Sequence, residues 1–220
     1  DDLLGRSVVV ANSAPCLRCR SCVRGRLSLC EDLTYLWGTY AEYVRVPARI
    51  VAHNLLSRPA GLAPQLAPLV EPLACAVNAV SRSDAAAGDR VVILGAGTQG
   101  QLPTARLVAR GCEAIVCDPH GPRRARALRF GASQTHDAPR DAEQIAALRE
   151  SLGGGGPEIV FEAVGRPETW EAAVSIAGRG GEVNLYGGCA PDTVVTLATG
   201  SLHYEALRIQ GSYHHTPDTV

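Results

Sequence analysis

A run of apolar strand formers leads directly into a Gly-x-Gly-x-x-Gly motif, and this junction constrains the fold more than any other feature. Residues 91–94 read Val-Val-Ile-Leu, and Gly95, Gly97 and Gly100 follow. In such a junction the first glycine permits a tight turn, the second lets a pyrophosphate approach the backbone, and the third lets helix and strand pack closely. The motif therefore predicts a βαβ unit that binds a dinucleotide. The competing interpretation is a glycine-rich turn between a core strand and a helix.

An acidic residue follows at the position that dinucleotide binding requires. Residues 115–117 form a second short strand, and Asp118 ends it, close to the expected ~20 residues beyond the glycines. A carboxylate there can accept hydrogen bonds from both hydroxyls of an adenosine ribose, although it could also be an ordinary cap. It would repel the 2′-phosphate of NADP, so we expect NAD rather than NADP. Thr98 and Gln99 open the helix whose free N–H groups face the anion. Arg123, in an arginine-rich helix, could contact the adenosine or a 2′-phosphate, or lie on a solvated face.

The remainder of this half alternates between strands and helices with glycine turns, which predicts a doubly wound parallel sheet. Ligands bind outside the carboxyl ends of such strands. Six residues at these ends are candidates to contact the nicotinamide half of the cofactor, with plain turn chemistry as the alternative: Val164, Gly165, Gly187, Gly188, Ser212 and Tyr213.

Four cysteines fall within one short stretch near the N-terminus, with spacing Cys16-x2-Cys19-x2-Cys22-x7-Cys30. Four thiolates in one loop suit a closed tetrahedral zinc site that structures the loop and has no open position for chemistry. An iron–sulfur cluster would prefer a shorter last gap. A zinc ribbon that binds nucleic acid usually has two separated Cys-x2-Cys pairs. The spacing therefore favours structural zinc.

The first eighty residues otherwise suggest a small β-rich domain. Residues 6–10 are a predicted strand, residues 38–47 alternate with strand period, and residues 49–52 could be another short strand.

Glu71 and Pro72 open a predicted helix. The carboxylate of Glu71 either complements the positive end of that helix or binds a metal. His214 and His215 are not expected to share a metal, because adjacent residues on a strand face opposite sides.

Taken together, these motifs resemble the zinc-dependent medium-chain alcohol and polyol dehydrogenases, most closely the sorbitol/iditol-like branch. The resemblance rests on the four-cysteine loop, the sequence Gly-x-Tyr-Ala-Glu-Tyr-Val at residues 38–44, the Glu-Pro-Leu-Ala sequence at residues 71–74 and the glycine triplet, and it covers essentially the whole chain. It implies an α/β fold: part of a GroES-like β-rich domain with a structural zinc lobe over residues 1–80, and a Rossmann NAD-binding domain over residues 81–220.

The resemblance also implies a function, namely NAD-linked oxidation of a secondary alcohol or polyol to a ketone by hydride transfer. The substrate would be a small-molecule alcohol; the branch includes dehydrogenases of the cyclitol 2-deoxy-scyllo-inosamine. In this family Glu71 would be a ligand of a second, catalytic zinc, and hence the candidate catalytic residue. The Cys-Gly-x-Asp and Gly-His-Glu elements that supply the other catalytic ligands have no counterpart here, and the family's C-terminal return to the β-rich domain is also missing from these 220 residues. We therefore expect a piece truncated at both ends and inactive by itself.

Two other functions compete with this interpretation. An NADPH-dependent quinone or enoyl reductase of the same superfamily typically lacks the cysteine lobe. A catalytically inactive dinucleotide-binding fragment is the other. The formal net charge of −1 gives no field that would recruit nucleic acid or a membrane surface. Of the eight cysteines, four are clustered and four are scattered, a pattern that favours a metal site in a reducing cytoplasm over a disulfide framework. The scattered ones are interpreted as small core residues: Cys75, Cys112, Cys117 and Cys189. We also expect a homo-oligomer, a dimer or a tetramer.

Overall fold

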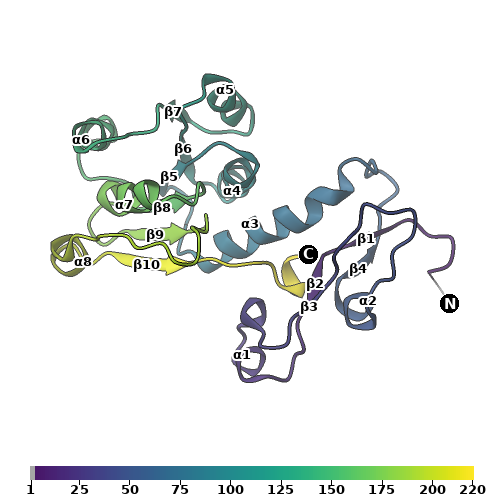
Figure 1. The fold of residues 1–220 in the computed structure, drawn as a ribbon. Helices are drawn as coiled ribbons and strands as arrows, with labels where there is room; N and C mark the ends of the chain where they lie inside the picture. The colour runs from purple at the N-terminus through teal and green to yellow at the C-terminus, as the bar shows by residue number, and fades with distance from the viewer. Residues whose placement is uncertain (1–2) are drawn as a thin grey trace. The chain divides into compact units, whose positions relative to one another are not determined.

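The computed structural model of this protein describes residues 3–220, which divide into two compact units (Figure 1). The first unit contains the residues up to Asn78 together with Tyr213–Val220, and the second contains Ala79–Ser212. The division differs from a single boundary after residue 80, because the last eight residues group with the first unit. No helix in the described part of the chain has the length and apolar character needed to cross a bilayer.

The second unit is built on a six-stranded sheet in the order β10-β9-β8-β5-β6-β7, and every neighbouring pair is parallel. The strands are β5 (Arg90–Leu94), β6 (Glu113–Cys117), β7 (Gln134–His136), β8 (Ile159–Glu162), β9 (Glu182–Leu185) and β10 (Arg208–Gly211). This is the doubly wound order of a Rossmann domain. The order reverses between β5 and β8, so the ends of these two strands form the switch point at which ligands bind.

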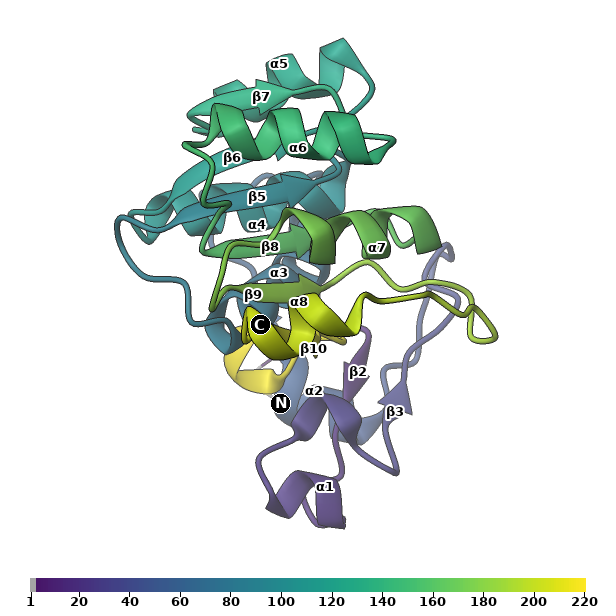
Figure 2. The ribbon, with the colours of Figure 1, turned by 90° about the vertical axis from the view of Figure 1, so that its left-hand side faces the viewer.

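Helices cover both faces of this sheet (Figure 2). They are α4 (Thr98–Ala109), α5 (Gly121–Arg129), α6 (Ala142–Ser151), α7 (Pro167–Ile176) and α8 (Thr199–Tyr204). Side chains of β5 alternate between two buried clusters. Val91 and Ile93 pack with Leu107 of α4, whereas Val92 and Leu94 pack in the cluster that contains Ile176 of α7. Because helices cover both faces of the sheet, the sequence of β5 is a continuous apolar run, as expected for a strand of a parallel sheet.

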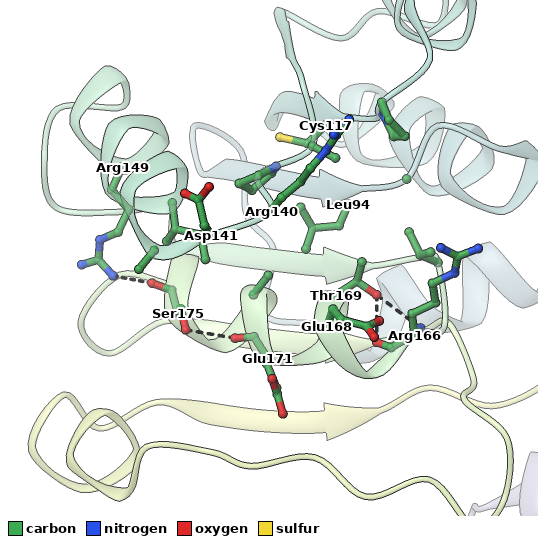
Figure 3. Close-up of a pocket in the computed structure, with 18 of the residues that line it drawn as sticks. Leu94, Cys117, Arg140, Asp141, Arg149, Arg166, Glu168, Thr169, Glu171 and Ser175 are labelled. Carbon is green, nitrogen blue, oxygen red and sulfur yellow. Dashed lines mark hydrogen bonds between the residues drawn. The ribbon is translucent and has the colours of Figure 1, made fainter.

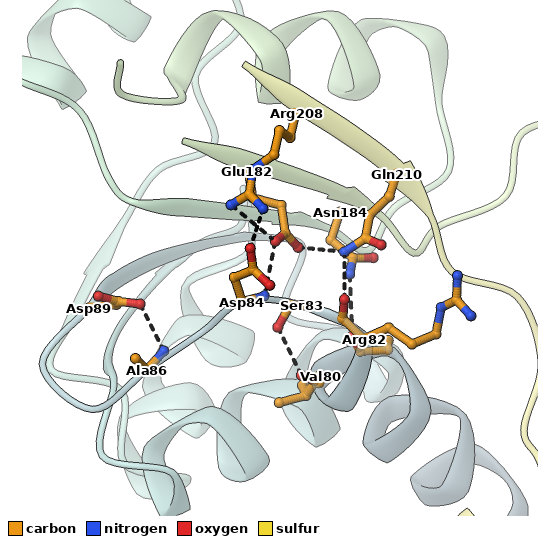
Figure 4. A network of polar contacts seen from close by, with 11 residues as sticks. Val80, Arg82, Ser83, Asp84, Ala86, Asp89, Glu182, Asn184, Arg208 and Gln210 are labelled. Atoms are coloured by element: carbon orange, nitrogen blue, oxygen red, sulfur yellow. Dashed lines mark hydrogen bonds and ion pairs between the residues drawn. The ribbon is translucent and has the colours of Figure 1, made fainter. Parts of the chain in front are cut away.

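A polar network ties β9 and β10 to the segment that precedes β5 (Figure 4). Glu182 is 3% exposed. Its carboxylate accepts hydrogen bonds from the backbone N–H of Asp84 at 3.0 Å and from Nε2 of Gln210 at 2.7 Å. The guanidinium of Arg208 pairs with Asp84 and lies 4.0 Å from Glu182. This buried carboxylate is therefore satisfied by several donors, as burial requires.

The first unit contains short strands and short helices. Strand β1 (Val8–Val10) pairs antiparallel with β4 (Leu55–Ser57), and β2 (Ser13–Ala14) pairs antiparallel with β3 (Thr34–Tyr35). Its helices are α1 (Arg20–Val23), α2 (Ala48–Asn54) and α3 (Val70–Arg82), the last of which continues into the second unit, with 3-10 turns η1 (Leu27–Leu29), η2 (Ala67–Leu69) and η3 (Pro217–Thr219).

Two predicted strands of this unit are wrong. Residues 38–47 contain no strand, and Tyr40 and Tyr43 are both exposed, so their alternation does not correspond to a buried and a solvated face. Residues 49–52 lie inside α2. That helix buries Ile50 and Asn54, four residues apart on one helical face, and Ile50 packs against Ala14 and Leu36.

Candidate functional site

The four clustered cysteines converge in the first unit. Their sulfur atoms all lie within 4.8 Å of one another, and the cysteines are free thiols. A tetrahedral zinc with Zn–S bonds of about 2.3 Å sets its sulfur atoms roughly 3.8 Å apart. The Sγ atoms of Cys19 and Cys30 are 4.0 Å apart, so this donor set fits zinc.

Local backbone geometry prepares these sulfurs as ligands. Cys19 is the N-cap of α1, and its Sγ accepts the N–H of Cys22 at 3.5 Å. The N–H of Cys19 donates to Sγ of Cys16 at 3.3 Å, and that of Cys16 donates to Sγ of Cys30 at 3.2 Å. Hydrogen bonds from backbone N–H groups, above all that of Arg18, lower the pKa of the Cys16 thiol to about 6. Such bonds favour the thiolate form that binds a metal, whereas burial raises the pKa of the Cys22 and Cys30 thiols.

Glu71 lies in the first turn of α3 with a second group of metal-binding side chains. Oε1 of Glu71 accepts a hydrogen bond from the Cys75 thiol at 3.3 Å. A ring nitrogen of His214 completes the group, and the three donor atoms lie within 4.8 Å of one another. Burial is the main factor that raises the pKa of the Cys75 thiol, and Glu71 adds to it. Sequence analysis interpreted Cys75 as a core residue and did not expect His214 to share a metal with His215, so neither was assigned to a group with Glu71.

His214 and His215 do not lie on a strand, so the strand geometry that argued against a shared metal does not apply to them. Strand β10 ends at Gly211, and His214 has a left-handed φ of +62°. The two histidine rings have centroids only 4.2 Å apart. Nε2 of His215 contacts Ser13 Oγ at 3.3 Å and Asn12 Oδ1 at 3.2 Å. His215 is thus held by polar groups of the first unit, whereas His214 lies beside Glu71.

The glycine motif in the second unit has the geometry that a dinucleotide loop requires. Gly95 has φ +98°, and a Cβ there would meet Val164 at 2.8 Å. A Cβ on Gly100 would lie 1.9 Å from the carbonyl oxygen of Gly95, whereas a Cβ on Gly97 would meet no atom within 4 Å. Gly97 is the N-cap of α4 and Thr98 its first residue. Close packing therefore requires glycine at Gly95 and Gly100, and the space beside Gly97 is open for a ligand.

Asp118 is buried beside this loop. Its Oδ2 accepts the N–H of Ala96 at 2.8 Å, and its Oδ1 accepts the N–H of His120 at 2.8 Å. The side chain of Arg123 approaches Oδ2 to 3.8 Å and is half exposed. A carboxylate has about four acceptor positions, so Asp118 can hold both backbone groups and still accept further hydrogen bonds. Gln99 accepts a hydrogen bond from the hydroxyl of Tyr186.

A pocket of about 770 Å³ opens beside these strand ends in the second unit (Figure 3). Its lining includes Gly95, Pro119, Arg140, Val164 and Arg166, and its volume lies within the range of ligand pockets. Sequence reasoning missed Pro119, Arg140 and Arg166. Each follows the end of a parallel strand, so the strand-end rule applied to every strand would have found them.

The glycines after β8 and β9 have a packing role. A Cβ on Gly165 would lie 2.5 Å from the carbonyl oxygen of Gly188, and one on Gly187 would lie 2.5 Å from the nitrogen of Gly165. Glu162 organises this turn, because its Oε1 accepts the N–H groups of Val164 and Gly165, both at 2.9 Å. Burial raises the pKa of Glu162. These contacts explain Gly165 and Gly187 by packing alone.

The last two cofactor candidates fall in different units. Ser212 closes the second unit, and its N–H donates to the carbonyl oxygen of Leu185 at 3.2 Å. Its buried Oγ has no hydrogen-bond partner among residues 3–220. Tyr213 begins the returning segment of the first unit, where its hydroxyl lies 3.3 Å from that of Tyr35. Tyr213 therefore contacts a residue of the first unit.

Comparison with known proteins identifies both parts of the chain. A model described as "Zinc-binding dehydrogenase" matches residues 100–220, and one described as "Alcohol dehydrogenase GroES-like domain" matches residues 3–56. L-galactonate-5-dehydrogenase of Escherichia coli K12 is 30% identical over 219 residues, which are 97% of this chain and 62% of that protein.

Solved structures agree with this assignment. Galactitol-1-phosphate dehydrogenase from Escherichia coli superposes with a TM-score of 0.83 at 26% identity, over 96% of this chain and 61% of that one. A Sinorhizobium meliloti 1021 protein bound to NADP gives a TM-score of 0.85 at 28% identity, over 96% and 62% of the two chains. The chain thus spans about three fifths of the length of these relatives. It belongs to the family of zinc-binding medium-chain dehydrogenases, and carries part of the family's GroES-like domain and a Rossmann domain.

Proposed function

We propose that this chain is the zinc-lobe and NAD-binding part of an oxidoreductase that oxidises a secondary alcohol or a polyol to a ketone. The observation that carries the proposal is the open space beside Gly97, at the switch point of a parallel sheet, with the buried carboxylate of Asp118 next to it. This is the arrangement that binds a dinucleotide. The four-sulfur group favours an alcohol dehydrogenase over a quinone or enoyl reductase.

Each cofactor residue has a defined role in this proposal. The N–H groups at the start of α4, including those of Thr98 and Gln99, face the pyrophosphate, which approaches through the space beside Gly97. Asp118 accepts the ribose hydroxyls, and Arg123 lies at the edge of the adenosine site. Pro119, which lines the pocket, supplies an apolar contact for the adenine ring, and Val164, which also lines it, stays a candidate for the nicotinamide half. When bound, the nicotinamide ring accepts the hydride.

We assign NAD rather than NADP as the preferred cofactor. Asp118 is 2% exposed and is held by two backbone N–H groups, so its charge cannot swing away from an incoming 2′-phosphate. Repulsion between that phosphate and the carboxylate disfavours NADP. The positive charge of Arg123 would instead attract a 2′-phosphate, but this guanidinium already lies 3.8 Å from the carboxylate of Asp118. The NADP-bound relative makes the comparison of the two cofactors the first experiment.

Ser212 is the strongest of the remaining candidates for the nicotinamide half. Its buried Oγ lacks a partner among residues 3–220, and a buried hydroxyl without one costs free energy, so a ligand group would satisfy it. Gly188 has open space around its Cα. Gly165 and Gly187 shape the turns that support this position. We keep Tyr213 as a candidate, although it contacts Tyr35 and His214.

Zinc has two roles in the proposal. Cys16, Cys19, Cys22 and Cys30 hold a structural ion, and Glu71 is a ligand of a second, catalytic ion. Zinc at the second position supplies a Lewis acid that polarises an alcohol oxygen. The residues of this chain would orient the substrate and exclude water there. Among the relatives, the names L-galactonate-5-dehydrogenase and galactitol-1-phosphate dehydrogenase support a polyhydroxylated substrate; a cyclitol remains one member of that class.

Assembly and compartment are further parts of the proposal. Strand β10 is an edge of the six-stranded sheet, and an unpaired edge can pair with a second chain, which supports a homo-oligomer. All eight cysteines are free, which supports a reducing, cytoplasmic location. We also propose that these 220 residues bind cofactor and metal without turning over substrate.

Calorimetric titration tests the cofactor assignment. NAD and NADP are titrated separately into the zinc-loaded chain, and NAD is expected to bind at least about tenfold more tightly, which is about 1.4 kcal/mol. A panel of polyols, sugar acids and cyclitols is then assayed by NADH absorbance. Equal affinity for NAD and NADP would remove the role assigned to Asp118, and turnover of a polyol by this chain would contradict its proposed inactivity.

A further inference from the structure

A group of three side chains in the first unit has the composition and spacing of a metal site separate from the four-cysteine loop. Glu71, Cys75 and His214 each direct one donor atom into a space in which all three atoms lie within 4.8 Å of one another. All three residues are partly buried, so the space is sheltered but open to solvent. The members come from two segments that are far apart in the sequence, α3 and the returning segment.

Helix α3 aligns two of the donors by its own periodicity. Glu71 and Cys75 are four residues apart, which places them on one helical face one turn apart. Sγ of Cys75 lies 3.3 Å from Oε1 of Glu71. Asn78 continues the same face, and its Nδ2 donates to the backbone carbonyl of His214 at 2.7 Å. The helix thus presents two ligand atoms and also anchors the backbone of the third residue.

His214 is fixed from several sides. It has a φ of +62°, a left-handed conformation that is costly for a residue with a Cβ and is often found at functional sites. Its Nε2 lies 2.5 Å from Oγ of Ser13. The ring also stacks on Tyr213, with centroids 5.4 Å apart and planes 27° apart. A metal-binding histidine commonly has its second nitrogen hydrogen-bonded, which sets the ring orientation.

We infer that Glu71, Cys75 and His214 bind one divalent transition metal of the zinc type. The inference rests on the proposed metal-binding role of Glu71 and adds Cys75 and His214 to it. One sulfur, one nitrogen and one carboxylate oxygen form a donor set suited to zinc rather than to magnesium or calcium. Tetrahedral bonds of about 2.0–2.3 Å separate ligand atoms by roughly 3.3–3.8 Å, so only a small contraction is needed. Three protein ligands leave a fourth position open.

Metal stoichiometry of the 220-residue chain tests this inference. The chain is stripped with a chelator, reconstituted with zinc or Co²⁺, and desalted, and its metal content is measured by mass spectrometry. Two ions per chain are expected. Co²⁺ adds a thiolate charge-transfer absorption for each site. Cys75→Ala, Cys75→Ser and His214→Gln should each bring the content to one ion, with a loss in affinity for the second ion of more than ~100-fold. Cys189→Ala and His203→Gln are the matched controls and should keep two.

The outcomes separate this inference from the proposed function. One ion in the unchanged chain, or two ions in folded Cys75 and His214 variants, overturns the inference. Loss of the second ion in Glu71→Gln alone would leave Glu71 as a ligand and remove Cys75 and His214. NAD binding is measured on the same samples. Whether the unchanged chain binds NAD tests the dinucleotide proposal independently of the metal content. Circular dichroism identifies any variant that fails to fold, and the more conservative Cys75→Ser then replaces Cys75→Ala.

Discussion

The carboxylate of Asp118 accepts the backbone N–H of Ala96 at 2.8 Å, so the residue proposed to bind ribose also holds the glycine loop in place. Replacement of Asp118 by Asn keeps its shape and removes its charge. We expect NAD affinity to fall by about 10- to 100-fold, since a hydrogen bond to a charged group contributes about 1.5–3 kcal/mol, and NADP affinity to fall less. Calorimetry with both cofactors measures the change, and Asp192→Asn, on an exposed loop, is the control. An unchanged ratio of the two affinities would exclude the assigned role.

Two glycines of the loop should respond differently to the same substitution. Gly97→Ala adds a methyl group where no atom lies within 4 Å, so the free energy of unfolding should change by less than about 0.5 kcal/mol. NAD affinity should nevertheless fall at least about tenfold, because the methyl occupies the path of the pyrophosphate. Gly100→Ala forces its Cβ to within 1.9 Å of the Gly95 carbonyl oxygen and should destabilise the fold by about 1–3 kcal/mol.

Denaturant unfolding and cofactor titration of both variants check this prediction. If Gly97→Ala bound NAD as tightly as the unchanged chain, the space beside Gly97 would not be the pyrophosphate site.

Replacement of a single cysteine of the loop should abolish zinc binding by the other three as well. Cys22→Ser removes the most buried of the four sulfurs, and we expect one fewer zinc per chain and faster proteolysis within residues 16–30. The reason is that structural zinc supplies much of the free energy that orders so short a loop. NAD affinity should stay within about twofold, because the Rossmann residues are untouched. Metal analysis and limited proteolysis test the variant, with Cys112→Ala as the control; retention of full zinc content would rule out the four-sulfur site.

The network around Glu182 gives a prediction about stability. Glu182→Ala leaves the N–H of Asp84 without its side-chain acceptor and removes one of the two acceptors of the Gln210 amide, whose other acceptor is the carbonyl oxygen of Arg82, and should cost about 2–4 kcal/mol. Arg208→Gln removes an exposed partner of the same network and should cost less than about 1 kcal/mol. Urea unfolding followed by tryptophan fluorescence measures both. Equal losses would contradict the larger contribution assigned here to the buried carboxylate of this network (Figure 4).

Sequence alone predicted the Rossmann part because its signals are local. The apolar run of β5, the glycine triplet and Asp118 lie within about thirty residues, and each residue type has one strong physical reason to be there. Residues 49–52 show where local reasoning failed: a short apolar stretch suits a strand or a buried helix, and only the packing of Ile50 under Ala14 and Leu36 decides.

The group around Glu71 could not be predicted in the same way. Cys75 reads as a small apolar residue within an amphipathic helix, and nothing near it in the sequence indicates a ligand. His214 joins it only because residues 213–220 return to the first unit. The left-handed φ of His214 is equally invisible, since glycine is the residue that normally marks such a position. Long-range closure of the chain, rather than any motif, creates this group.

Binding of NAD by the zinc-loaded chain tests the central claim most directly. In a calorimetric titration at fixed ionic strength, with metal content verified on the same sample, the account predicts one NAD per chain and weaker binding of NADP. Absence of measurable heat with NAD at millimolar concentration, in a folded sample that holds its zinc, would contradict it.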